Sequence, residues 1–154
     1  MKNVFSLLST ALFTLALTTS CVQETTPDTL SGTYCGEMEV ELNIPNLQDD
    51  DWTLTNRQVV VTRVDDSHVD ITLDLNLAQY VNIAITDENL DFGTITARCL
   101  VGPTIKGETP LSGTATIARQ AVPVWGEYDE RVLDIGISLG IVTVEFEGVK
   151  HAVR

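Results

Sequence analysis

Three cysteines are the side chains with the most definite chemistry in this chain of 154 residues. Cys21 follows a run of twenty residues that differs in composition from what comes after it, whereas Cys35 and Cys99 lie in the remaining part. A thiol can carry a lipid, form a disulfide, bind a metal or act as a nucleophile, and its surroundings decide between these roles. For Cys21, the preceding segment gives the clearest indication.

The first 20 residues have the organisation of a secretion signal. Lys2 supplies a positive start, residues 4–17 form an apolar run, and the three residues at 18–20 are small. The apolar run is shorter than the roughly 20 residues that span a bilayer. We therefore predict a signal peptide over residues 1–20. A transmembrane anchor, or a signal that is cleaved without lipid attachment, is the alternative.

The sequence LTTSC at residues 17–21 resembles a lipobox, the site at which a diacylglyceryl group is attached to cysteine before cleavage. In that pattern a leucine usually stands three residues before the cysteine, whereas Leu17 stands four before Cys21. Because Val22 follows, the aspartate associated with inner-membrane retention is missing. The resemblance implies that Cys21 is the lipid-anchored first residue of a mature outer-membrane protein. Two or three acyl chains, such as palmitate, anchor a protein stably where one does not.

Cys35 and Cys99 remain as an even pair once Cys21 carries lipid. An exported compartment permits a disulfide, and closing this long loop could stabilise the fold by roughly 4 kcal/mol. The alternation described below puts Cys35 on a face shared with glutamates and Cys99 on an apolar face. A disulfide, or two unpaired thiols that pack as small apolar groups, therefore both remain open.

Acidic side chains permit two further kinds of site, neither with a specific spacing. Asp49–Asp51 and Asp65–Asp66 could supply oxygen ligands to Ca²⁺, but acidic loops are more often simply solvated. Glu127, Asp129 and Glu130 carry carboxylates of the kind that glycosidases use, but they fall in a predicted turn where acids are expected.

The remaining polar residues form no recognisable catalytic or metal motif. His68 and His151 stand alone, and no C-x-x-C, H-E-x-x-H or EF-hand spacing is present. No nucleophile elbow or similar frame holds a serine, a histidine and an aspartate together. We therefore predict no metal site, no cofactor and no enzymatic activity. A net charge of −13 without a Lys/Arg cluster also argues against nucleic-acid binding and against electrostatic docking onto anionic lipids.

The elements that must position these residues are strands, because alternation of apolar and polar residues dominates from Ser31 onward. In residues 69–77 every second side chain is Val, Ile or Leu, and the residues between them are polar. The alternation and the turn residues between segments predict nine strand-like segments: 33–43, 57–64, 69–77, 80–86, 93–101, 111–118, 121–128, 131–138 and 141–148.

Short hairpin connections favour one all-β domain over residues 31–154, an antiparallel up-and-down barrel of about eight strands. The hydrophobic content of 44% suffices for a core of its own. Residues 21–30 are polar and predict a tether, and residues 45–56 predict a loop. Pro123 predicts an edge, a bulge or an irregular join in its segment.

The interior of such a barrel is either filled by side chains or wide enough for one small ligand. We expect the inward face to be lined by Tyr34, Met38, Val60, Leu73, Ile83, Leu111, Ala115, Ile137, Val144 and Phe146. Trp125 is expected to plug the barrel or to contact the ligand, and Trp52 in the predicted loop could do either. Small residues such as Gly36 and Ala97 could leave space, but any packed core would contain the same residue types.

Strand patterns at three places resemble those of the bacterial calycin-like lipoproteins. They are LSGTY and EMEV within residues 30–40, LSGTATI at 111–117, and LDIGI and VTVEFEG within 133–148. The similarity covers residues 30–149 and implies a lipocalin-like barrel of eight strands that binds apolar or lipidic ligands, with no catalytic residues. The leading prediction is thus a lipid-anchored cell-envelope barrel with a small apolar ligand inside. The alternative is a filled barrel whose acidic outer surface contacts a partner protein or glycan.

Overall fold

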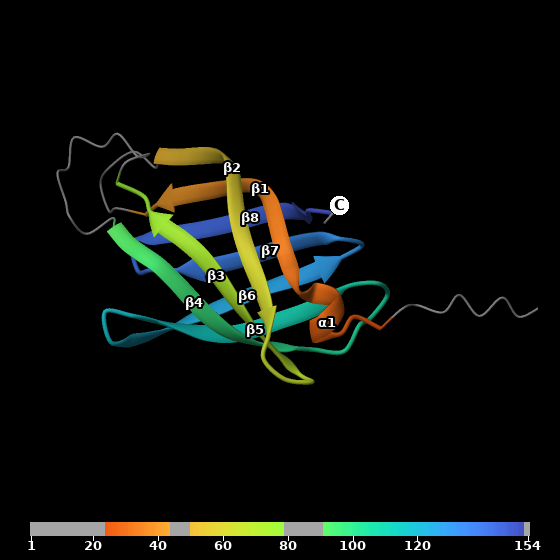
Figure 1. The fold of residues 1–154 in the computed structure, drawn as a ribbon. Coiled ribbons are helices and arrows are strands. Elements are labelled where there is room, and N and C mark those ends of the chain that lie inside the picture. The colour runs from red at the N-terminus through yellow and green to blue at the C-terminus, as the bar shows by residue number, and fades with distance from the viewer. Residues whose placement is uncertain (1–23, 44–49, 79–90, 153–154) are drawn as a thin grey trace, which may run out of the picture.

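A computed structural model describes residues 24–43, 50–78 and 91–152 of the chain. Eight strands of these residues close into one antiparallel barrel (Figure 1), in which each strand pairs with the next along the chain and β8 pairs with β1. The elements are α1 (Pro27–Leu30), β1 (Gly32–Leu42), β2 (Asp50–Arg63), β3 (His68–Asn76), β4 (Asp91–Val101), β5 (Thr109–Ile117), β6 (Gln120–Asp129), β7 (Val132–Ser138) and β8 (Val142–Lys150). The up-and-down barrel predicted from the alternation is confirmed.

The alternation in the sequence becomes the inside and the outside of the barrel. Along β3, buried apolar side chains alternate with partly exposed polar ones. From Met38 to Leu42 in β1, buried apolar residues alternate with exposed glutamates. A strand with one apolar and one polar face is stable only when its apolar face packs against other apolar faces. Closure of the sheet brings the apolar faces of all eight strands together.

The strand β2 is longer than predicted, because it begins at Asp50 and includes residues assigned above to a loop. Trp52 packs against the core and Leu54 is buried, while Asp51 and Thr53, which alternate with them, are exposed. The run of aspartates at 49–51 obscured this short alternation in the sequence, although Asp51 simply lies on the solvent-exposed face of the strand. The predicted strand at 80–86 lies outside the described residues.

β1 bends sharply, and β2 bends beside it, on the side of the barrel that these two strands form (Figure 1). The pairing register of β1 with β2 shifts between Gly36 and Met38, and Asn56 on β2 has a φ of 56°, in the left-handed region. A Cβ atom at Gly36 would lie 1.9 Å from the carbonyl oxygen of Glu147 on β8. The bend therefore needs glycine, and the bulge on β2 supplies the extra residue that a tightly curved sheet requires.

The short helix α1 covers one end of the barrel and is part of the domain. Leu30 has no exposed surface, and the Tyr34 hydroxyl donates a 2.7 Å hydrogen bond to the Leu30 carbonyl. The ring of Tyr34 also meets that of Tyr128 edge to face, at 6.3 Å between centroids. The packed domain thus begins before Ser31, and only the first part of the predicted tether at 21–30 precedes it. Among the described residues, no helix has the length and apolar character needed to cross a membrane.

Pro123 lies in β6 where that strand has only one paired neighbour. It stands opposite Thr114 of β5, whereas the ladder between β6 and β7 ends one residue later, at Val124 and Ile137. Proline lacks the N–H that a second ladder would need, so the edge predicted from its presence is confirmed locally.

Candidate functional site

Most residues predicted to face the interior do so. The seven that are at most 1% exposed are Tyr34, Met38, Leu73, Ala115, Ile137, Val144 and Phe146. Leu111 is buried as well. Ile83 and the predicted lipidation site Cys21 lie outside the described residues.

Two of the predicted interior residues, Val60 and Trp125, face outward instead. Val60 is 41% exposed, because its neighbours Val59 and Val61 occupy the inward positions of β2. Three consecutive valines carry no alternation, so their sequence could not indicate which of them points inward. Trp125 is 43% exposed, because Val124 takes the inward position in β6.

The indole of Trp125 lies across β7 on the outside of the barrel. A Cβ atom at Gly136 would lie 2.4 Å from this ring, so only glycine leaves room for it. Gly136 is buried although it points outward, because the indole covers it. On its other side Gly136 pairs with Glu145 of β8, which places the aromatic ring beside the acidic surface described below.

Cys35 and Cys99 are both free thiols. Cys35 is half-buried on the outer side of β1, and Cys99 is buried on the inner side of β4. Two strands separate β1 from β4 in the barrel, so the disulfide considered above does not form. Burial, with a smaller contribution from Asp70, raises the pKa of the Cys99 thiol to about 11, which keeps it protonated and unreactive.

The interior is tightly packed along the described strands. Its largest side chains include Tyr34, Phe146, Met38, Leu73 and Leu133, and each is at most 1% exposed. A side chain that bordered a water-sized cavity inside the barrel would have accessible surface, and these side chains have almost none. The described lining therefore leaves no water-sized space at these side chains, which corresponds to the close packing of ordinary protein interiors.

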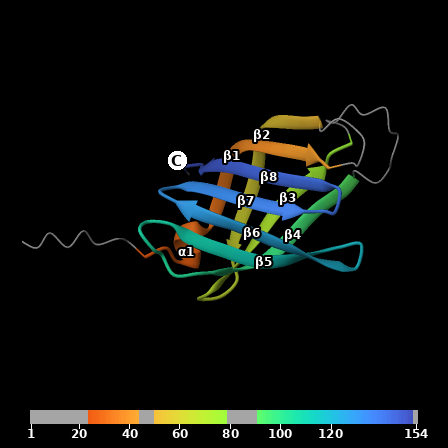
Figure 2. The same ribbon diagram turned by 180° about the vertical axis from the view of Figure 1, so that it is seen from behind.

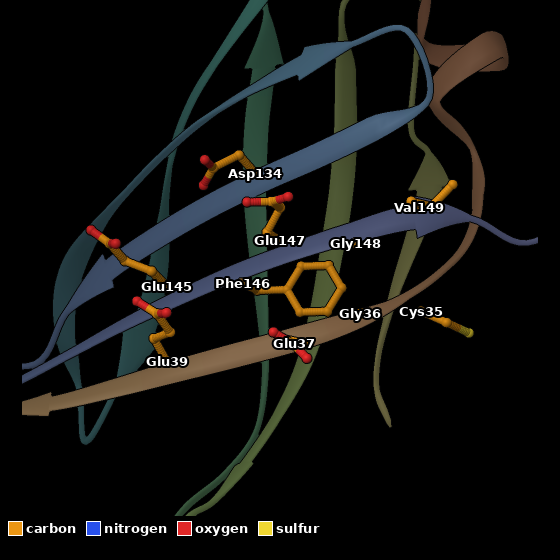
Figure 3. Close-up of a pocket in the computed structure, with 10 residues that line it drawn as sticks. All are labelled: Cys35, Gly36, Glu37, Glu39, Asp134, Glu145, Phe146, Glu147, Gly148 and Val149. Atoms are coloured by element: carbon orange, nitrogen blue, oxygen red, sulfur yellow. The ribbon is translucent and has the colours of Figure 1, made fainter. Parts of the chain in front are cut away.

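Open volume is found instead on the outer face. A groove of about 290 Å³ lies over the bend of β1, and Figure 3 shows the carboxylates around it. It is lined by Cys35, Gly36, Glu37, Glu39, Asp134, Glu145, Phe146, Glu147, Gly148 and Val149. Gly36 and Gly148 let β1 and β8 approach closely beneath it, because a Cβ atom at Gly36 would meet the backbone of Glu147 and Gly148.

A second hollow of about 480 Å³ continues this groove toward the beginning of β2. Glu39 and Glu145 line both, and the second adds Val40, Glu41, Asp51, Trp52, Thr53 and Thr143. We call the two together the acidic groove. Its lining contains seven carboxylates and no lysine or arginine.

Strand pairing sets these carboxylates directly opposite one another. The pairs are Glu37 with Glu147, Glu39 with Glu145, Asp134 with Glu147, and Glu41 with Asp51. Like charges at such positions destabilise a sheet. Partial burial, together with Glu145 and Glu147, raises the pKa of Asp134. Folding alone would not favour this arrangement.

The acidic groove was not identified as a site from the sequence, although part of its signal is visible there. Alternating glutamates occur at 37–41 and again at 145–147. These two runs are far apart in the sequence, near the beginning and the end of the domain. Only the pairing of β8 with β1 brings them together. Their convergence depends on closure of the barrel and on its register, which alternation does not specify.

The other acidic candidates are not brought together. Asp51 lies at the beginning of β2, and Asp65 and Asp66 follow the end of that strand, so the proposed calcium ligands are a full strand apart. Hydrogen bonds from Ser67 and His68 lower the pKa of Asp65 to about 2 and tie it into its own turn.

The predicted acids of β6 and its turn are also distributed. Glu127 pairs with Asp134, while Asp129 and Glu130 lead into the turn before β7. Within the described part of the chain, no three His, Cys, Asp or Glu side chains are arranged to hold a metal ion.

The chain matches no family model and no curated protein. Of what the resemblance to calycin-like lipoproteins implies, the structure contains the eight-stranded up-and-down barrel.

Proposed function

We propose that this protein is a lipid-anchored, non-enzymatic interaction module of the cell envelope, whose acidic groove binds a cationic segment of a partner protein. The observation that carries the proposal is the distribution of space. The largest inward side chains, among them Tyr34, Met38 and Phe146, are fully buried, whereas two hollows on the outer face adjoin one another. Binding needs accessible volume, and these two hollows provide it on the outer face of the barrel.

The chemistry of the groove favours a positively charged partner. Seven carboxylates surround a groove without a lysine or arginine, and four like-charge pairs lower the stability of the barrel. A lysine- or arginine-rich segment would relieve this repulsion and would gain charge-assisted hydrogen bonds.

A partner protein fits this groove better than an apolar ligand inside the barrel. A lipidic ligand would have to displace side chains such as Tyr34, Met38 and Phe146, which are fully buried. Displacing packed core side chains by a ligand is costly, because the interior would have to rearrange. The packed interior thus supports the filled-barrel alternative over the ligand carrier.

The lipid anchor at Cys21 is the second part of the proposal and rests on the sequence. The test is an intact-mass measurement of the mature protein purified from membranes. We expect a chain that begins at Cys21 and carries the added mass of its acyl chains. A mature chain with an unmodified N-terminus would contradict the anchor without affecting the groove.

The groove is tested by the binding of a fluorescent lysine-rich peptide to the mature protein. We compare the double variant Glu145→Gln/Glu147→Gln with a control, Glu108→Gln/Glu130→Gln, whose exposed side chains lie outside the groove. Both doubles change the net charge equally. The groove variant is expected to weaken binding several-fold more than the control, with a difference that shrinks at high salt. Equal weakening by both would show that only net charge attracts the peptide, and would refute the proposal.

A further inference from the structure

The first described residues of the chain are fastened to one end of the barrel. The backbone N–H of Thr25 donates a 3.0 Å hydrogen bond to the Thr104 hydroxyl in the β4–β5 loop. The Lys150 ammonium at the end of β8 donates to the Thr29 carbonyl at 2.5 Å. These two hydrogen bonds and the buried side chain of Leu30 fasten α1 and the residues before it to the barrel.

This fastening shortens the link to a lipid on Cys21. Thr25 is four positions after Cys21, and an extended chain over four steps reaches at most about 14 Å. A free tether over the whole of residues 21–30 would reach roughly 35 Å, more than twice as far. The lipid therefore keeps the α1 end of the barrel close to the bilayer surface.

The β4–β5 loop presents an apolar side chain at this same end. Ile105 is 62% exposed, the largest exposed fraction among the exposed large apolar residues of the described chain. An isolated bridge between Ile105 and Glu108 and a left-handed Lys106 (φ 56°) form a tight turn that holds it outward. Because Thr104 accepts the hydrogen bond from Thr25, this loop and the beginning of the domain are joined directly.

The acidic groove extends toward the opposite end. Glu41 and Asp51 stand at the far ends of β1 and β2, away from α1 (Figures 1 and 2). An orientation with the α1 end at the bilayer places this part of the groove away from the surface. Net charge does not attach the protein to the membrane, since the chain carries −13.

We infer that the barrel stands on the membrane with its α1 end toward the bilayer, and that Ile105 in the β4–β5 loop contacts the lipid surface. The occupant of this exposed apolar tip is thus the bilayer itself, at the depth of the headgroups and the first acyl carbons. The inference rests on the proposed lipid anchor at Cys21. It is independent of what binds in the acidic groove.

The test uses the lipidated protein in vesicles of phosphatidylethanolamine and phosphatidylglycerol. In a Cys35→Ser background, Ile105→Cys is labelled with an environment-sensitive fluorophore. The matched control is Ile141→Cys, an exposed isoleucine (51%) in the β7–β8 turn at the opposite end, where its carbonyl accepts from the backbone N–H of Asn43. Cys99 is buried, and labelling of Cys35→Ser alone verifies that it does not react.

Nitroxide lipids with a shallow spin label report contact, and intact mass reports the lipid on Cys21. We expect quenching at position 105 to be several-fold larger than at position 141 in protein with a lipidated Cys21. Equal or reversed quenching in lipidated protein overturns the orientation and leaves the anchor standing. An unmodified Cys21 overturns the anchor and the orientation that rests on it.

Discussion

Single residues decide which groups reach the outer surface of this barrel. Gly136 leaves the space in which the Trp125 indole lies, and Gly36 allows the bend over which the acidic groove opens. Neither effect could be predicted from the sequence, because a glycine in a strand indicates a bend or a close approach without naming the group that approaches. The outward position of Val60 could not be predicted either, because both of its neighbours in the sequence are also valine.

Gly136→Ala tests the contact between β7 and the indole. The new methyl group would meet the Trp125 ring at 2.4 Å, so the ring must move. We expect a loss of about 1–3 kcal/mol in the free energy of unfolding, as for other overpacked sites, and a change in tryptophan emission. Urea unfolding in a double-mutant cycle with Trp125→Ala checks the cause. If Gly136→Ala costs as much without the indole, the ring is not what the glycine accommodates.

At the scale of elements, strand type and order were predictable and register was not. Alternation in 33–43 and 69–77 identified β1 and β3, because half-buried strands require it. The beginning of β2 was missed because Asp49–Asp51 look like a loop, and α1 was missed because four residues carry no periodicity. The acidic groove is a property of register, since it arises where β1, β2, β7 and β8 align their carboxylates.

Truncation tests whether α1 belongs to the barrel. A mature domain beginning at Ser31, the predicted boundary, lacks the buried Leu30 and its hydrogen bond from Tyr34. We expect it to be at least about 2 kcal/mol less stable than a chain beginning at Glu24, because loss of a buried leucine alone costs that much. Thermal and urea unfolding of the two chains provide the comparison. Equal stability would show that residues 24–30 are a tether after all.

Two aspartates on opposite sides of the barrel, Asp134 on β7 and Asp70 on β3, should change its stability with opposite signs when their charge is removed. The pKa of Asp134 is raised by partial burial and by Glu145 and Glu147, whereas hydrogen bonds from Arg98 lower the pKa of Asp70. A raised pKa means that the charged form opposes folding, so this penalty is present at neutral pH and disappears as pH falls through the folded-state pKa. A lowered pKa means stability that is present above the unfolded-state pKa and is lost as pH falls through the lower, folded-state value.

We therefore expect Asp134→Asn to stabilise the barrel at pH 7 and Asp70→Asn to destabilise it. Both effects are expected to be at most about 1 kcal/mol, because solvent screens charges at this level of exposure. Both should diminish as the pH is lowered, and unfolding free energies measured at several pH values give the comparison. The cross-strand account is contradicted if Asp134→Asn destabilises the protein at pH 7.

At the scale of the whole molecule, the barrel separates packing from binding. Its interior holds the apolar residues that stabilise the fold, and its outer face over β1, β2, β7 and β8 carries charge that folding does not favour. A stability cost that is retained on an accessible surface is typical of sites that serve binding. The fold class follows from composition and alternation, whereas the binding surface requires the closed barrel, in which the first and last strands become neighbours.

The measurement that tests this account most directly is an NMR titration of the ¹⁵N-labelled domain with the lysine-rich peptide. We expect chemical-shift changes in the amides of β1, β7 and β8 that border the acidic groove, including Glu39, Glu145 and Glu147, and in the indole N–H of Trp125. The amides of the β4–β5 loop should stay unchanged. Changes spread evenly over all acidic surfaces, or centred on the α1 end of the barrel, would contradict the claim that this groove is the binding site.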